Sequence, residues 1–147
     1  NILSSINYWW ERLPKSTLVT PHIGEFNRIY KFKNYESIFE KLINFSKLTS
    51  LCILLKGPST LIAQNNEIIV NTAPNGGMSK PGMGDVLTGL IGGLGSLPKI
   101  KLKDAAILGA YVHSEAGRLS RKIKGSTSMT ASDVISFIPQ VFKNLEK

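Results

Sequence analysis

The chain has a single cysteine, Cys52, among its 147 residues. An internal disulfide and a zinc site built from several cysteines are therefore excluded. Cys52 lies in the apolar run 51–55, which predicts a buried and unreactive thiol. The sequence also has no apolar run long enough to span a bilayer and no secretory signal pattern at its start. We therefore expect a cytoplasmic protein that does not bind a membrane.

Acidic residues are few: 10 Asp and Glu stand against 18 Lys and Arg, which gives a formal net charge of +8. Such an excess attracts nucleic acid, anionic membrane surfaces or small phosphorylated ligands. The basic residues are scattered, and no aromatic residues are interleaved with them to form a base-stacking surface. We therefore expect no nucleic-acid partner.

Two common phosphate-binding signatures are missing. No Gly-x-x-x-x-Gly-Lys-Ser/Thr string occurs, which excludes a P-loop. The dinucleotide fingerprint also fails, because Gly82-Met83-Gly84 is followed by Leu87 where a third glycine should stand. If the chain binds phosphate, it belongs to another class.

Glycines nevertheless crowd toward one carboxylate, Asp85, and an apolar helical pattern begins directly after it. Glycine allows backbone N–H groups to converge on a phosphate, and the start of a helix adds unpaired N–H groups and a positive dipole end. We expect residues 82–86 to cradle a polyphosphate. Asp85 has two interpretations: a base that takes a proton from an attacking hydroxyl, or a first-turn acid that stabilises its own helix.

The remaining pattern predicts an α/β fold with a sheet of mainly parallel strands and a β-hairpin, formed as a single domain over residues 1–147. His22 and Lys56 each follow a strand, at the sheet edge where ligands collect in such folds. Glycines 89, 92, 93 and 95 imply that the helix after Gly82 packs closely against a sheet or a ligand. The predicted strands are 17–20, 51–55, 61–63 and 68–70, and the predicted helices are 2–13, 25–29, 35–45, 103–119 and those that start near 82 and 130.

Five motifs occur in a fixed order: Pro21-His22-Ile23-Gly24-Glu25, Leu55-Lys56-Gly57-Pro58-Ser59-Thr60, Asn71 with Asn75-Gly76-Gly77-Met78, Gly82-Met83-Gly84-Asp85-Val86-Leu87-Thr88-Gly89, and Thr130-Ala131-Ser132-Asp133. Together they resemble the nicotinamide nucleotide hydrate dehydratases. That resemblance implies a ribokinase-like three-layer α/β/α fold. It also implies ADP- or ATP-dependent conversion of the S-epimer of hydrated NADH or NADPH back to the working cofactor. Two alternatives remain open: a ribokinase-superfamily kinase of a small alcohol, and a noncatalytic nucleotide-binding module.

By this resemblance, Asp85 binds the substrate and deprotonates its ring hydroxyl, which attacks the terminal phosphate before phosphate is eliminated. Gly82 and Gly84 hold the transferring phosphate, and His22 contacts the hydrated dinucleotide. Magnesium accompanies the nucleotide phosphates, and no metal site made of protein side chains alone is expected. The nucleotide site is lined by Lys56, Gly57, Pro58, Ser59 and Thr60.

The resemblance further implies that the chain is the carboxyl-terminal part of a longer domain, since family members have a long amino-terminal half. We expect association with that half or with another copy through the strand 17–20, which would lie at an open edge. Pro81 and Lys80 stand where the family usually has small residues. Pro81 has no N–H to donate, and we expect the charge of Lys80 to offset that loss in part. The resemblance also covers His113, which we interpret as a packing residue, whereas Glu25 is read as a first-turn helix acid.

Overall fold

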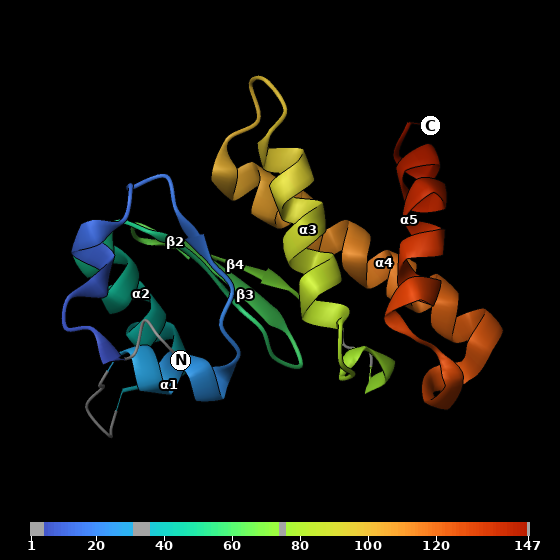
Figure 1. Ribbon diagram of the computed structural model, residues 1–147, viewed down its shortest axis with the longest axis horizontal. Helices are drawn as coiled ribbons and strands as arrows, with labels where there is room; N and C mark the ends of the chain where they lie inside the picture. The colour runs from blue at the N-terminus through green and yellow to red at the C-terminus, as the bar shows by residue number, and fades with distance from the viewer. Residues whose placement is uncertain (1–4, 31–35, 74–75, 147) are drawn as a thin grey trace. The chain divides into compact units, whose positions relative to one another are not determined.

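The computed structural model describes residues 5–30, 36–73 and 76–146. The chain divides into two compact units, Asn1–Val70 and Asn71–Lys147 (Figure 1). Each unit has its own core and is described by itself. Within the described residues, no helix is both long enough and apolar enough to cross a bilayer.

The first unit is built on a four-stranded sheet in the order β1-β2-β3-β4. β1 pairs in parallel with β2, so that Leu18 lies opposite Cys52, and β2 pairs antiparallel with β3. β1 is an edge strand, as the sequence predicts for residues 17–20. The elements are η2 (Trp9–Arg12), β1 (Leu18–Val19), α1 (Ile23–Ile29), α2 (Ile38–Thr49), β2 (Cys52–Leu55), β3 (Thr60–Gln64) and β4 (Glu67–Asn71).

β2 is one of the two inner strands of the sheet, and all four of its residues are buried. This confirms the prediction from the continuous apolar run, including the buried position of Cys52. α2 packs against β2 and β3. It begins with a capping box between Ser37 and Glu40, and its Ser46 hydroxyl donates to the Asn65 carbonyl in the β3–β4 turn at 2.7 Å.

An aromatic cluster forms the core of this unit on the side of α1 and α2. Trp9, Phe26 and Phe45 are buried, and the Phe26 and Phe45 rings meet edge to face at 5.6 Å. The sequence predicts a helix over residues 2–13; residues 2–4 lie outside the described residues, and residues 5–13 contain 3-10 structure, chiefly η2, and no α-helix. The rings of Trp9 and Trp10 in this stretch instead both pack against the Phe45 ring.

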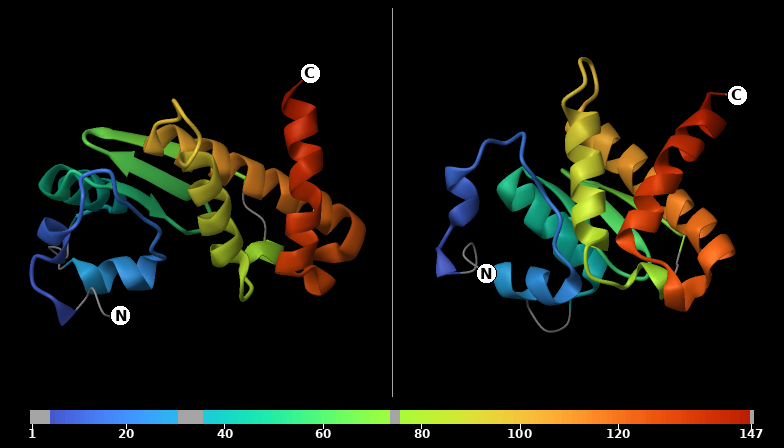
Figure 2. Two further views of the ribbon diagram at one scale, coloured as in Figure 1. Left: turned by 45° about the horizontal axis from the view of Figure 1, so that its top comes forward. Right: turned by 45° about the vertical axis from the view of Figure 1, so that its right-hand side comes forward.

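The second unit is helical, and both α3 and α5 pack against the long helix α4 (Figure 2). Its core includes Met83, Val112, Met129 and Val134. α4 is longer than the predicted 103–119 and has one non-helical residue, Gly125, at φ 77° and ψ 161°. The elements are η3 (Gly76–Met78), α3 (Met83–Gly95), α4 (Leu102–Ser128) and α5 (Ala131–Leu145).

Close approach in this unit depends on glycines of α4 rather than those of α3. A Cβ at Gly109 would come within 3.5 Å of the Ile91 Cα, whereas a Cβ at Gly89, Gly92 or Gly93 would meet nothing within 4 Å. Within this unit no packing contact accounts for Gly89, Gly92 or Gly93, and their approach to a ligand stays a prediction. Gly89 instead lines a groove described below.

Candidate functional site

His22 and Lys56 lie at the carboxyl ends of the neighbouring parallel strands β1 and β2. The two residues form an isolated parallel β-bridge, and the Lys56 N–H donates to the Pro21 carbonyl at 2.8 Å. The sequence predicts that both residues follow strands, and the structure brings them together. This edge of the sheet presents an imidazole and an ammonium group side by side.

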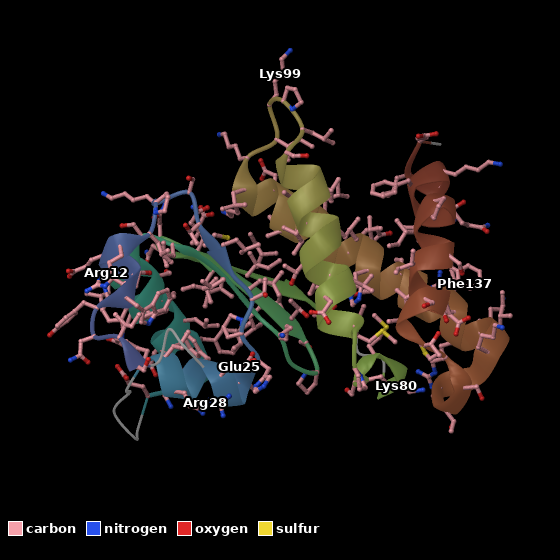
Figure 3. The ribbon with its side chains drawn as sticks, viewed as in Figure 1. Arg12, Glu25, Arg28, Lys80, Lys99 and Phe137 are labelled. Atoms are coloured by element: carbon pink, nitrogen blue, oxygen red, sulfur yellow. The ribbon has the colours of Figure 1, made fainter. Side chains whose placement is uncertain are left out.

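Glu25, labelled in Figure 3, lies at the start of α1 and contacts both of these residues. Its carboxylate accepts from the His22 backbone N–H at 2.7 Å and lies 3.9 Å from the Lys56 Nζ. The His22 Nδ1 accepts from the Glu25 N–H at 3.1 Å, so the proton of the neutral ring is on Nε2. The hydrogen bond from His22 holds the pKa of the Glu25 carboxyl below its usual range, with Lys56 contributing by its charge.

Glu25 therefore has the first-turn role that the sequence predicts, and in this role it also positions His22. Gly24 allows the ring to lie where it does, because a Cβ at this position would come within 3.1 Å of the His22 Cε1. The imidazole stays half exposed, with a side-chain exposure of 53%. The ring is thus held in one orientation by the start of α1, with its Nε2 3.6 Å from the Glu25 carboxylate.

The predicted nucleotide-binding segment 56–60 connects β2 to β3 and includes the first residue of β3. Gly57 and Pro58 are exposed, while Lys56, Ser59 and Thr60 are partly buried. A Cβ at Gly57 would come within 3.3 Å of the Ser59 carbonyl oxygen, so the turn is tight at this point. The segment is accessible within its own unit, as a ligand-binding turn must be.

The glycine-rich segment of the second unit leads into α3 as the sequence predicts. Gly82 is the N-cap residue at φ 83°, a conformation that favours glycine, and a Cβ here would come within 3.1 Å of the Ala131 Cβ. Met83 is buried in the core between Gly82 and Gly84. The two glycines that we expect to hold phosphate therefore flank a side chain that anchors the segment.

Asp85 is the third residue of α3, the N3 position. The acids at this position in α1, α2 and α5 (Glu25, Glu40 and Asp133) each accept from the backbone N–H of their N-cap residue in a capping box. Asp85 makes no such bond, is exposed, and has no hydrogen-bond or ion-pair partner among the described residues. It is therefore free to act on a ligand.

A groove with a volume of about 410 Å³ runs beside Asp85 between α3 and α5. Its walls are almost wholly apolar, and Asp85 is the one charged residue in them. The other lining residues are Val86, Gly89, Leu90, Ile135 and Ile138. An apolar ring lying in this groove would be close to the Asp85 carboxylate.

His113 of α4 contacts the same helix start from the interior. The residue is only 8% exposed, and it makes a hydrogen bond to the Met83 backbone. Its Nε2 is buried and has no partner among the described residues, which leaves Nδ1 as the donor. Burial lowers the pKa of this imidazole to about 4, so His113 is neutral at pH 7. The interpretation of His113 as a packing residue omitted this polar contact.

Asn71, another motif residue, has a structural role in the second unit. Its Nδ2 donates to the Ala110 carbonyl and to the Ser114 hydroxyl of α4, both at 2.9 Å. Asn75, from the same motif, lies outside the described residues. Within the described ranges, no group of three His, Cys, Asp or Glu side chains is placed to hold a metal ion.

Solved structures share the fold of this chain. It matches a ribokinase-like superfamily protein from Enterococcus faecalis with a TM-score of 0.71 and 23% identity, which supports the fold. An ADP/ATP-dependent NAD(P)H-hydrate dehydratase from Bacillus subtilis, co-crystallised with ATP and Mg²⁺, matches with a TM-score of 0.79 and 28% identity. That match covers 86% of this chain and 47% of the Bacillus chain. The predicted α/β class is thus confirmed.

The sequence model of the family described as NAD(P)H-hydrate dehydratase matches residues 3–140, and the chain belongs to this family. A bifunctional NAD(P)H-hydrate repair enzyme of Moorella thermoacetica is 37% identical over 134 residues, covering 88% of this chain and 25% of that protein. An ADP-dependent (S)-NAD(P)H-hydrate dehydratase of Cenarchaeum symbiosum is 32% identical over 139 residues, covering 90% of this chain and 47% of that protein. The chain thus spans between a quarter and about half of the length of these relatives.

Proposed function

We propose that this chain carries the nucleotide-binding and catalytic acid-base part of an ADP- or ATP-dependent dehydratase that acts on the S-epimer of hydrated NADH or NADPH. The observation that carries the proposal is the state of Asp85: an exposed carboxylate, free of a capping role, directly after a glycine-capped helix start. Family membership supports the same activity.

In the proposed reaction Asp85 takes the proton of the ring hydroxyl, and the hydroxyl oxygen forms a bond to the terminal phosphorus as the bond to the nucleotide breaks. Gly82 and Gly84 hold the transferring phosphate through their N–H groups. Elimination then breaks the bond between the ring carbon and the phosphate oxygen, and the loss of a proton from the neighbouring carbon restores the double bond. The groove beside Asp85 accommodates the hydrated nicotinamide ring.

The nucleotide lies along the turn 56–60, and His22 contacts the hydrated dinucleotide through its Nε2–H. Mg²⁺ fits this donor set as an ion carried mainly by the nucleotide phosphates, where it neutralises charge during transfer. We further propose that the protein is cytoplasmic. The chain associates through the edge strand β1, either with an amino-terminal half like that of its relatives, to form one domain, or with another copy of itself.

Asp85→Asn tests the catalytic assignment. Turnover in NADH regeneration from chemically hydrated NADH, with Mg²⁺ and ADP or ATP, should fall at least about a hundredfold, while nucleotide affinity changes by no more than a few-fold. Asp104→Asn is the matched control, because Asp104 is the exposed N3 acid of α4 and makes no capping box. Equal activity in the Asp85 variant would refute the assignment, and joint loss of affinity and turnover would indicate a structural role.

Two assay results would identify the alternative functions. A stable phosphorylated small alcohol would identify a kinase instead. Nucleotide binding without turnover, even at high concentrations of the chain, would identify a noncatalytic module. Nucleotide-dependent recovery of NADH absorbance by the wild-type chain would establish the dehydratase activity and show that these 147 residues suffice for it.

A further inference from the structure

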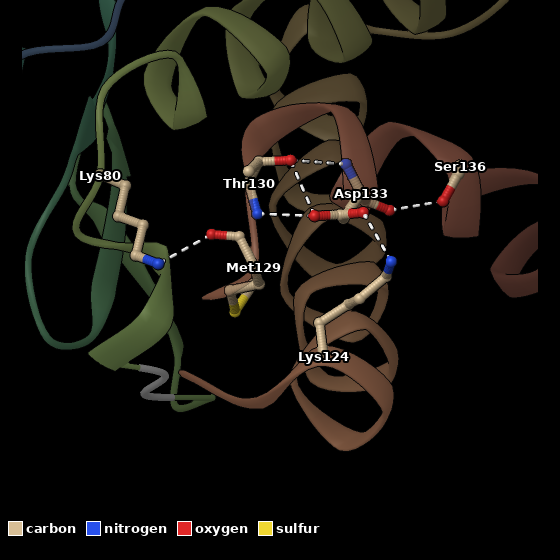
Figure 4. A network of polar contacts seen from close by, with 6 residues as sticks. All are labelled: Lys80, Lys124, Met129, Thr130, Asp133 and Ser136. Carbon is tan, nitrogen blue, oxygen red and sulfur yellow. Dashed lines mark hydrogen bonds and ion pairs between the residues drawn. The ribbon is translucent and has the colours of Figure 1, made fainter. Parts of the chain in front are cut away.

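The segment before α3 is attached to α4 and α5 at several points, and the side chain of Lys80 makes the strongest polar attachment (Figure 4). Its Nζ donates to the Thr127 carbonyl at 2.6 Å and to the Met129 carbonyl at 2.8 Å. Carbonyls at the end of a helix have no intrahelical partner, and a cation there also meets the negative end of the helix dipole. The ammonium group of Lys80 therefore caps the end of α4.

These carbonyls are presented by the irregular end of α4. Gly125 adopts φ 77° and ψ 161°, a conformation open essentially only to glycine, and the Met129 N–H closes the following turn on the Gly125 carbonyl at 3.3 Å. Asp133, the N3 acid of α5, bonds to Thr130 and lies 3.8 Å from the Lys124 Nζ. The connection from α4 to α5 is thus held in one shape that receives Lys80.

Two contacts on either side of Lys80 fix the same segment. Met78 lies against Gly117 of α4, where a Cβ would come within 2.9 Å of the Met78 Cε. Gly82 lies so close to Ala131 at the start of α5 that a Cβ would come within 3.1 Å. Lys80 is between these apolar contacts and supplies the one polar attachment of the three. Its charge is directed at helix carbonyls, not at the glycines, contrary to the expected offset for Pro81.

We infer that Lys80 is a positioning residue: it fixes Gly82 and Gly84 in the phosphate-binding conformation by holding the segment 78–82 to the end of α4, and it does not itself bind phosphate. The inference rests on the proposed function, since it assumes that the glycines bind the nucleotide phosphates. A preformed site binds more tightly because less ordering is needed when the ligand arrives. Removal of the attachment should therefore weaken nucleotide binding from a distance.

The attachment is tested first without any ligand, by amide hydrogen exchange in Lys80→Met, Lys80→Arg and Lys122→Met. Lys80→Met keeps the length of the side chain but removes its donors, so exchange should become at least about tenfold faster at the hydrogen-bonded amides of Met83, Met129 and Thr130. Lys80→Arg should restore most of the protection, and Lys122→Met, which removes an exposed charge on α4, should leave it unchanged. Unchanged exchange in Lys80→Met would overturn the inference.

Calorimetric binding of ATP with Mg²⁺ tests the consequence for the ligand. The Kd should rise about tenfold in Lys80→Met, and Gly125→Ala, which cannot hold the carbonyl-bearing turn, should have a similar effect. Because both changes break one attachment, the double variant should bind no more weakly than the weaker single variant. If the rise in Kd of the double variant equals the product of the two single rises, Lys80 contacts phosphate directly, and the inference is overturned. A wild-type chain that binds no ATP would refute the proposed function, and hydrogen exchange would then decide the attachment alone.

Discussion

Acidification should destabilise the second unit because His113 is buried in its neutral form. Its pKa is about 4 in the folded chain and 6.5 as its ordinary value. Below pH 6.5 the unfolded chain binds a proton that the folded chain does not, so stability is lost as pH falls from 7 toward 4. The difference between the two pKa values corresponds to about 3 kcal/mol in the free energy of unfolding. About 2 kcal/mol of this stabilisation is lost between pH 7 and pH 5.

The assay is urea unfolding followed by circular dichroism at 222 nm, at half-unit steps of pH, for the wild type and His113→Gln. Glutamine keeps a side-chain N–H for the Met83 backbone but does not titrate, so other titrating groups cancel in the difference between the two proteins. The stability advantage of the wild type should shrink by about 2 kcal/mol between pH 7 and pH 5. A difference that stays constant over this range would show that His113 is not held neutral by burial.

Two further predictions concern packing. Gly109→Ala should destabilise the second unit by about 1 to 3 kcal/mol, because its Cβ would overlap Ile91 of α3. Gly93→Ala should instead stabilise the unit by up to about 1 kcal/mol, because a Cβ at this exposed position of α3 meets nothing within 4 Å. Equal shifts of the urea midpoint in the two variants would contradict this assignment. Cys52 is fully buried in β2, so its thiol should react with a disulfide reagent at the rate of unfolding and not in the folded state, and rapid labelling of the folded chain would contradict that burial.

Much of the fold follows from local sequence. The apolar run around Cys52 predicts a strand buried on both faces, and Thr130 with Asp133 predicts the start of α5. The extent of α4 was not predictable, because its last turns carry few apolar residues and are exposed. They are held by Lys80, which lies outside the helix, and by the ion pair of Lys124 in α4 with Asp133 of α5. The first predicted helix was wrong because an apolar spacing that suits a helix also suits a cluster of rings around Phe45.

The candidate site also has features that the sequence predicts and features that it does not. Adjacency of His22 and Lys56 follows from the rule that parallel strands end at one edge of a sheet, and the Asp85 position follows from the glycine pattern. Lys80 and Thr127 are 47 residues apart, and nothing in a single sequence indicates that they meet. Contacts of a side chain with distant backbone carbonyls leave no periodic pattern, which is why the positioning role of Lys80 emerged only from the structure.

Pro81 need not weaken the proposed phosphate site, although it lacks an N–H. The Met83 N–H is already used in a turn to the Lys80 carbonyl at 3.3 Å, and the Val86 N–H bonds to the Gly82 carbonyl at 3.0 Å. Within the described part of the chain, the N–H groups of Gly82, Gly84 and Asp85 have no acceptor, so three backbone donors are left at the start of α3. The fixed φ of proline restricts the segment between Lys80 and Gly82. Pro81 and the Lys80 attachment therefore act in the same direction: both reduce the ordering that phosphate binding would otherwise require.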